Sequence, residues 1–198
     1  APERRGDGVA RLEQVHAVIG ALGPSYTSPG RYACFLMNAI LGGSMSSRLF
    51  QEVREKRGLA YSIHSYVVSY RDAGKVGIYV GTTERSFRQV LDLIYAELTR
   101  IKTESLTERE LYAAKEQIKG NFLLGMESTD TRMTKLAKNE IYFERQITIE
   151  ETLAGIDAVG PEDVLQLANE LFRPEALSIA ALGQITRENM KGSVLGVG

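Results

Sequence analysis

The sequence predicts an α+β domain with one mainly antiparallel sheet and helices packed on one face of it. Two segments rich in β-branched and aromatic residues, 60–69 and 75–82, are joined by a link short enough for a hairpin. Segments of helical periodicity gather mainly after this hairpin. The length of 198 residues and the hydrophobic content of 43% suit a single domain with a full core.

The first elements are a strand and a buried helix. Apolar residues alternate over 14–22, which is typical of a strand, and Gly23 with Pro24 ends it. Dense apolar residues over 31–41 predict a buried helix that stops at Gly42. The expected order is therefore strand, helix, helix, strand, strand, several helices and a last strand.

A second, short helix is expected before the hairpin. Ser46 or Ser47 would cap its start, and Gly58 would end it. Its expected buried stripe is Leu49, Phe50 and Val53.

Most of the remaining chain is predicted to be helical. Apolar residues recur with helical spacing over 87–101. Two capping boxes, Thr107 with Glu110 and Thr148 with Glu151, mark further helix starts.

The end of the domain has two further signals. Pro161 fits the first turn of another helix, and 177–182 fits a last short strand. We expect residues 1–13 to form a linker or arm, 14–184 the domain, and 185–198 a loose tail.

Charge and hydropathy exclude several classes of protein. Twenty-four basic residues against 25 acidic ones leave a net charge of −1, which argues against a nucleic-acid partner. No apolar run is long enough to span a membrane, and no signal peptide is visible. We expect no membrane partner and a cytoplasmic, bacterial location. The start at Ala1 indicates processing or a piece of a longer protein.

Residues that could carry chemistry are few. Cys34 is the single cysteine and lies in an apolar run, where a free cysteine behaves as a small buried hydrophobe. His16 and His64 both fall in expected strands, and neither belongs to a His-x-x-Glu-His motif. The sequence therefore predicts hydrogen-bonded or half-exposed histidines rather than a zinc site.

The segment 41–66 is the most distinctive part of the chain, with the sequence LGGSMSSRLFQEVREKRGLAYSIHSY. It closely resembles the M16 metallopeptidases, the family of pitrilysin, insulysin and mitochondrial processing peptidase. Residues 13–16, 106–115 and 182–183 resemble the same family at its first strand, long helix and last strand. The resemblance runs from about residue 12 to about residue 184, nearly the whole chain.

The resemblance implies a division of labour between two similar halves. The family's N-terminal half carries the zinc motif, which this chain lacks, so the chain resembles the zinc-free C-terminal half. That half lends an Arg and a Tyr to the zinc site of its partner, and here they are Arg54 and Tyr61. The resemblance thus implies no cofactor in this chain, zinc in the partner half, and a shared chamber for a peptide substrate.

The chemistry of this pair is sensible, because peptide hydrolysis builds negative charge on the carbonyl oxygen that a phenol and a guanidinium can stabilise. A plainer alternative is that Arg54 forms surface ion pairs with Glu52 or Glu55, and that Tyr61 only covers the sheet. Arg48, on the same short helix, is interpreted as structural and as bonding loop carbonyls.

Two other functions remain open. The chain could be a non-catalytic M16-like binding or assembly subunit, or an unrelated α+β ligand-binding domain. As part of a peptidase, the isolated chain should be inactive. Its zinc-bearing half could lie in cis or in trans, and the assembly could be a homodimer or a heterodimer.

Overall fold

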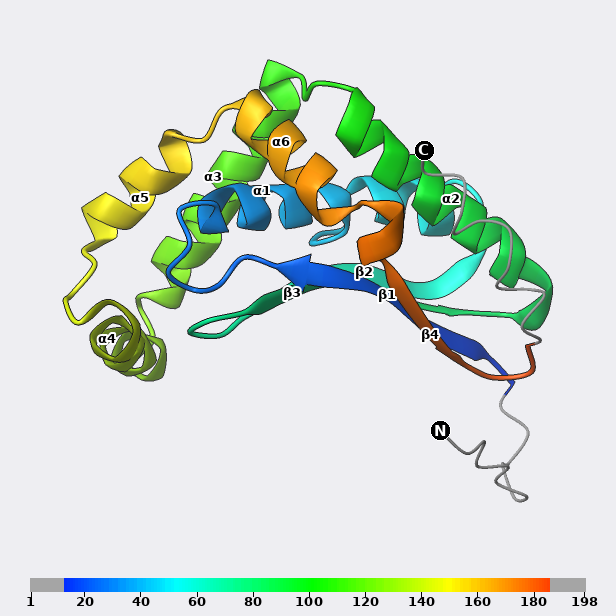
Figure 1. The fold of residues 1–198 in the computed structure, drawn as a ribbon, viewed down its shortest axis with the longest axis horizontal. Helices are drawn as coiled ribbons and strands as arrows, with labels where there is room; N and C mark the ends of the chain where they lie inside the picture. Colours follow the sequence, from blue (N-terminus) through cyan, green and yellow to red (C-terminus); the bar gives the residue numbers. More distant parts are fainter. Residues whose placement is uncertain (1–12, 186–198) are drawn as a thin grey trace.

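One four-stranded antiparallel sheet, in the order β2-β3-β1-β4, organises the fold, with the helices gathered on one side of it (Figure 1). A computed structural model describes residues 13–185. The elements in chain order are β1 (Val15–Gly23), α1 (Arg31–Leu41), η1 (Phe50–Glu55), β2 (Ala60–Ser69), β3 (Gly74–Thr82), α2 (Glu84–Thr103), α3 (Glu108–Gly125), α4 (Thr129–Phe143), α5 (Ile149–Asp157), α6 (Pro161–Leu171), η2 (Pro174–Ala176) and β4 (Ser178–Leu182).

The predicted fold class and element order are confirmed. The expected hairpin is β2 paired with β3, and β1 pairs antiparallel with both β3 and β4. The helix over 31–41 and the strand over 60–69 have the expected bounds. The predictions for the arm over 1–13 and the tail over 185–198 fall, apart from residues 13 and 185, outside the described residues.

Within the described part of the chain, helices cover only one face of the sheet. Along β1 the side chains of Val15, Ala17 and Ile19 are buried against the helices, while those of His16 and Leu22 on the opposite face are partly or largely exposed. Strand side chains alternate between faces, so this pattern identifies a sheet with one apolar and one open face. The covered face and the helices share one continuous hydrophobic cluster. A core of this kind is expected to let the chain fold on its own.

Threonine or serine side chains cap the starts of α2, α3, α4 and α5, whereas α1 and α6 begin after glycines. The box of Thr148 and Glu151 is complete, with both hydrogen bonds at 3.1 Å. Thr107 accepts a hydrogen bond from the Glu110 backbone N–H at 3.2 Å, but the Glu110 carboxylate does not return to Thr107. The predicted capping box of Thr107 and Glu110 is therefore only half right, because the Glu110 carboxylate binds Arg48.

Helix α4 shows the limit of periodicity as a signal. The sequence predicts residues 129–143 to be helical only as part of the long helical region and marks no separate helix there. Asn139 is the one buried residue of α4, and its apolar side chains Met133, Leu136 and Ile141 are exposed, so the helix contributes little to the core. Among the described helices, none is both long enough and apolar enough to cross a bilayer.

Cys34 is fully buried on α1, as predicted. Burial raises the pKa of its thiol from 9.0 to about 12. Burial likewise raises the pKa of the Tyr95 hydroxyl. Both groups are therefore neutral in the folded chain at physiological pH.

Alkaline pH is expected to destabilise the fold through Cys34. Above its ordinary pKa of 9.0 the unfolded chain releases the thiol proton while the folded chain retains it up to about 12. The free energy of unfolding should therefore fall with rising pH in this window, by up to about 1.4 kcal/mol per pH unit. Urea unfolding across the window should show a shallower pH slope for Cys34→Ala. Equal slopes for the two proteins would contradict this account.

Candidate functional site

The backbone between residues 50 and 62 departs from regular structure three times in succession, beginning with η1. This segment is a π-helix, in which the Lys56 N–H donates to the Gln51 carbonyl five residues earlier at 3.0 Å. π-Helical turns are rare and occur frequently at functional sites. The predicted short helix therefore exists, but as a π-helix rather than an α-helix. The amino-acid composition of this segment does not predict a π-helix.

The expected cap and buried stripe of this helix are only partly right. Neither serine caps it: the Ser47 hydroxyl donates to the Ser44 carbonyl, and Ser46 contacts the Ser44 hydroxyl at 3.1 Å. Leu49 and Val53 are fully buried, as predicted. Phe50 is only half-buried, and its ring lies under the guanidinium of Arg54 in the next turn.

Gly58 makes the second departure. It has φ of +61°, the left-handed region that a residue with a Cβ adopts reluctantly, and its N–H donates to the Arg54 carbonyl at 3.0 Å. Leu59, which follows Gly58 and leads into β2, is held by hydrogen bonds at both its N–H and its carbonyl. The Leu59 N–H donates to the Val53 carbonyl at 3.0 Å, and the Thr82 hydroxyl donates to the Leu59 carbonyl. Gly58 thus ends the helix, as predicted.

A β-bulge at the start of β2 makes the third departure. Ala60 pairs with Thr82 and Ser62 pairs with the preceding Gly81, so Tyr61 has no partner across the ladder. Bulges redirect a side chain and are over-represented beside active sites. Tyr61 is 78% exposed, which an aromatic side chain buried on the sheet would not be. The sequence predicted the strand here, but a bulge has no reliable sequence signal.

Arg54 is exposed in the last turn of η1, and its guanidinium lies 5.0 Å from the centre of the Phe50 ring. The neighbouring Glu52 carboxylate binds Lys56 and Arg57 instead, and these hydrogen bonds lower the pKa of Glu52. Within residues 13–185, Arg54 forms no ion pair. The alternative that Arg54 only serves surface ion pairs is therefore not what the structure shows.

Arg48 anchors the other end of this segment. Its Nε and Nη2 donate to the two carboxylate oxygens of Glu110 on α3, at 2.7 and 2.8 Å. The expectation that Arg48 is structural fits this ion pair, but the predicted bonds to loop carbonyls are wrong. A carboxylate offers the planar guanidinium two parallel charge-assisted hydrogen bonds, which single carbonyls do not. The partner lies 62 residues away, beyond the reach of any spacing argument.

The two histidines lie on the open face of the sheet, one half-buried and one exposed, as predicted. His16 on β1 and His64 on β2 flank Tyr79 of the intervening strand. The His16 Nδ1 lies 2.8 Å from the Tyr79 hydroxyl, and the His64 and Tyr79 rings are 5.1 Å apart. Among the described residues no three His, Cys, Asp or Glu side chains gather closely enough to hold a metal ion.

Comparison with protein families gives a decisive match over more than half of the chain. Residues 4–118 match the peptidase M16 inactive domain. The chain belongs to this M16 family. The resemblance of segment 41–66 to the zinc-free half of these peptidases is thereby confirmed.

Relatives of the M16 domain include zinc proteases and solved structures. This chain is 41% identical over 160 residues to the uncharacterized zinc protease YmxG of Bacillus subtilis, and the match covers 81% of this chain and 39% of that protein. A conserved protein of Enterococcus faecalis has a similar structure, with a TM-score of 0.78, 28% identity, and coverage of 89% and 41% of the two chains. The M16 inactive domain from Pseudomonas fluorescens has the same fold, with a TM-score of 0.79, 23% identity, and coverage of 89% and 42%.

These relatives are longer than the M16 domain described here. The chain spans about two fifths of their length, 39% of the Bacillus protein and 41% of the Enterococcus protein. The chain is an M16 inactive domain related to zinc proteases.

Proposed function

We propose that this domain completes the active site of an M16 zinc peptidase, by supplying Arg54 and Tyr61 to a site whose zinc is held by a partner half. The observation that carries the proposal is that these two polar side chains, close in sequence, both lack a hydrogen-bond partner among the described residues. Among the described residues, neither the Arg54 guanidinium nor the Tyr61 hydroxyl donates or accepts a hydrogen bond. Both lie exposed, seven residues apart, on a backbone held by a π-helix, a left-handed glycine and a bulge.

Stabilising a transition state requires hydrogen-bond donors that are free to bind the substrate and are held in place by an anchored backbone. Val53 and Ala60, which precede each candidate by one residue, are buried and anchor the segment to the core. Donors held in advance cost little reorganisation when charge develops on a substrate carbonyl. In this proposal Arg54 and Tyr61 bind and orient the peptide carbonyl oxygen.

The zinc-bearing half would supply the metal and the water that the metal activates. The greater length of the zinc proteases that resemble this chain supports a partner half in cis, since one such domain accounts for 39% of the Bacillus relative.

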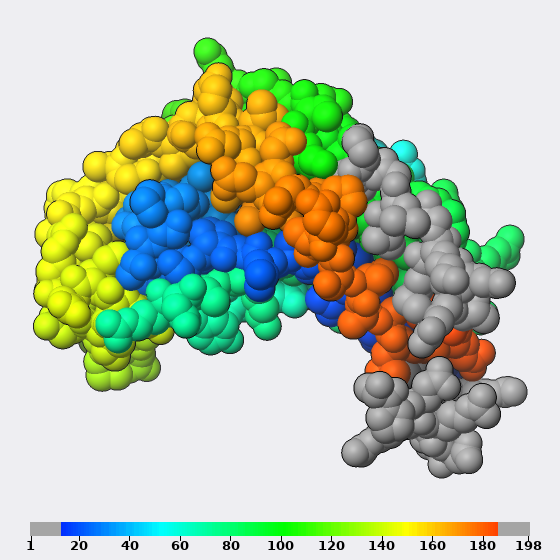
Figure 2. Space-filling model, in the orientation of Figure 1, coloured from blue at the N-terminus to red at the C-terminus, as the bar shows by residue number. Residues whose placement is uncertain are grey.

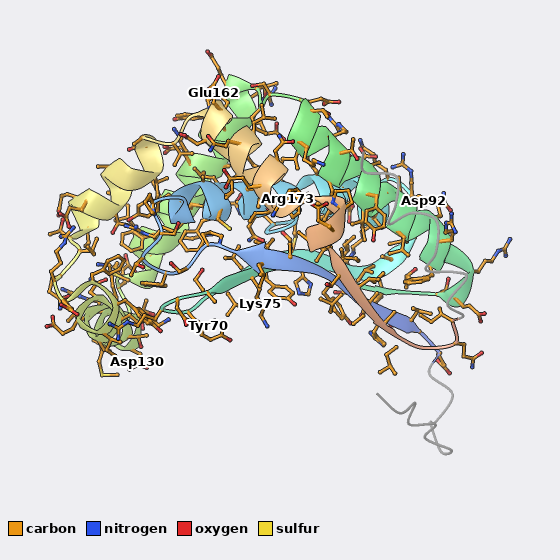
Figure 3. All side chains as sticks on the ribbon, in the orientation of Figure 1. Tyr70, Lys75, Asp92, Asp130, Glu162 and Arg173 are labelled. Carbon is orange, nitrogen blue, oxygen red and sulfur yellow. The ribbon has the colours of Figure 1, made fainter. Side chains whose placement is uncertain are left out.

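The open face of the sheet is proposed as one wall of a peptide chamber. No described helix covers this face, and Figure 2 shows the molecule hollowed beneath the sheet, between α4 at one end and β4 at the other. Lys75 projects from this side in Figure 3. A partner half that faces the hollow would enclose a space for an extended peptide.

Reconstitution tests the proposal. The 198-residue chain alone should cleave no peptide, whereas the chain mixed with, or joined to, the zinc-bearing half of the same protein should cleave an unstructured peptide. Assembly without cleavage would favour the alternative, a non-catalytic assembly subunit. Cleavage by the zinc half alone, at a rate that this chain does not increase, would refute the proposed role.

A further inference from the structure

A second candidate site lies at the end of the molecule formed by α3, α4 and α5 (Figure 1). An open cavity of about 290 Å³ is lined there by these helices, by α1 and by the loop that precedes it. No residue of η1 or β2 lines this cavity, so it is separate from Arg54 and Tyr61. Its volume is near the lower end of the range for small-molecule sites, roughly 300–1,000 Å³.

The walls of the cavity are rich in aromatic rings. Tyr26 and Phe143 lie with their ring centres 5.7 Å apart, which joins the loop before α1 to the end of α4. Rigid rings of this kind favour a flat or extended apolar ligand over a hydrated ion. The aromatic lining residues are Tyr26, Tyr32, Phe35, Phe122 and Phe143.

Of the described residues, three basic side chains and no Asp or Glu line the same cavity. The Arg31 guanidinium lies 4.3 Å from the centre of the Tyr32 ring. The Lys135 and Lys138 ammonium groups lie 5.9 Å from the Phe122 and Tyr26 rings. Within residues 13–185, none of these three cations forms an ion pair.

Their hydrogen bonds go to neutral groups instead. Arg31 donates to the Ser28 carbonyl at 3.2 Å and to the Tyr32 hydroxyl at 3.1 Å. Lys135 donates to the Ile147 carbonyl.

One carboxylate, that of Glu151, acts on Lys135 from outside the lining. Its charge raises the pKa of Lys135, but burial outweighs it and the pKa is lowered overall. Glu151 is already held by Arg145 at 3.0 Å and by the Thr148 backbone N–H at 3.1 Å. The cavity therefore joins an apolar wall to positive charge that no lining carboxylate balances.

We propose that this cavity binds a small carboxylate with an aromatic or acyl body. The carboxylate would lie against Lys135, Lys138 and Arg31, and the body against the rings. Such a group exists as a free acid and as the C-terminal residue of a peptide, and both share the chemistry that the cavity recognises. The inference does not depend on the proposed peptidase function.

Ligand-observed NMR on the 198-residue chain tests the proposal with four probes. Hydrocinnamate and N-acetylphenylalanine carry the carboxylate on an aromatic body, hydrocinnamide keeps the body without the charge, and inorganic phosphate has charge without the body. At least one of the two carboxylates should bind, and more tightly than hydrocinnamide or phosphate. Binding of hydrocinnamate assigns a free acid, and binding of N-acetylphenylalanine alone assigns a peptide terminus. Binding of neither carboxylate, or equal binding of hydrocinnamide, would overturn the proposal.

Charge-removing variants locate the binding. Lys135→Gln and Lys138→Gln should each weaken carboxylate binding at least about threefold, the effect of losing one partly exposed charge contact. Lys138 makes no hydrogen bond to the backbone of residues 13–185, so its variant separates binding from any change in folding, which melting curves would monitor. Lys102→Gln makes the same change on α2, which contributes nothing to the cavity lining, and should bind as the unaltered chain does. Unchanged binding by both lining variants would place the ligand elsewhere.

Discussion

Replacing Tyr61 by Phe is expected to lower the turnover of the assembled peptidase by about a hundredfold to a thousandfold, the usual cost of losing one donor to a developing oxyanion. The substitution removes only the hydroxyl. The ring is 78% exposed and lies on a bulge with no partner strand residue, so the fold should tolerate the change. KM should change little, because the lost interaction belongs mainly to the transition state. Steady-state peptide cleavage by the assembled two halves measures both constants.

A matched control exists on the same hairpin. Tyr70 is 54% exposed at the turn between β2 and β3, where Figure 3 labels it, and its hydroxyl has no partner among the described residues. Tyr70→Phe should leave turnover unchanged. If both variants cleave peptide as fast as the unaltered protein, Tyr61 has no part in the chemistry. If both lose activity equally, exposed phenols on this hairpin matter for assembly instead.

Replacing Glu110 by Gln is expected to reduce the free energy of unfolding by about 1.5–3 kcal/mol, the usual contribution of hydrogen bonds to a charged group. The Arg48 side chain is only 12% exposed, and its Nη1 is already buried without a partner. Removing the carboxylate charge would leave a guanidinium in a confined site with weaker acceptors, which is costly. Urea unfolding followed by circular dichroism measures the difference.

Glu108→Gln is the control for this prediction. Glu108 lies exposed in the same first turn of α3, so its loss should cost only the favourable interaction with the helix N-terminus, about 0.3–1 kcal/mol. Equal destabilisation by the two variants would show that the contact with Arg48 contributes nothing beyond the helix terminus. Faster amide exchange over η1 in Glu110→Gln alone would show that the ion pair holds the candidate site in place.

Local patterns account for most of the fold. Alternation along 14–22 and along the hairpin strands specifies a half-buried sheet, and apolar residues at helical spacing specify α2 and α6. These features follow from which side chains avoid water along a single segment. Helix α4 is not predicted as a separate helix, because it buries little of its surface.

The candidate site is less visible from the residues alone. The family resemblance over 41–66 singled out Arg54 and Tyr61, but the neighbouring carboxylates of Glu52 and Glu55 left surface ion pairs open as an alternative for Arg54. Only the folded chain shows Glu52 committed to Lys56 and Arg57. The π-helix and the bulge likewise arise where the chain must join buried Val53 to the edge of the sheet.

Periodicity, turn residues and one long motif thus define this chain as an α+β domain of the M16 family, because these are properties of short segments. The partner of Arg48 on α3, the pairing of His16 with Tyr79, and the basic aromatic cavity emerge only after folding. Each of them joins residues that lie dozens of positions apart. Contacts of that kind depend on how helices and strands pack, and no local pattern encodes them.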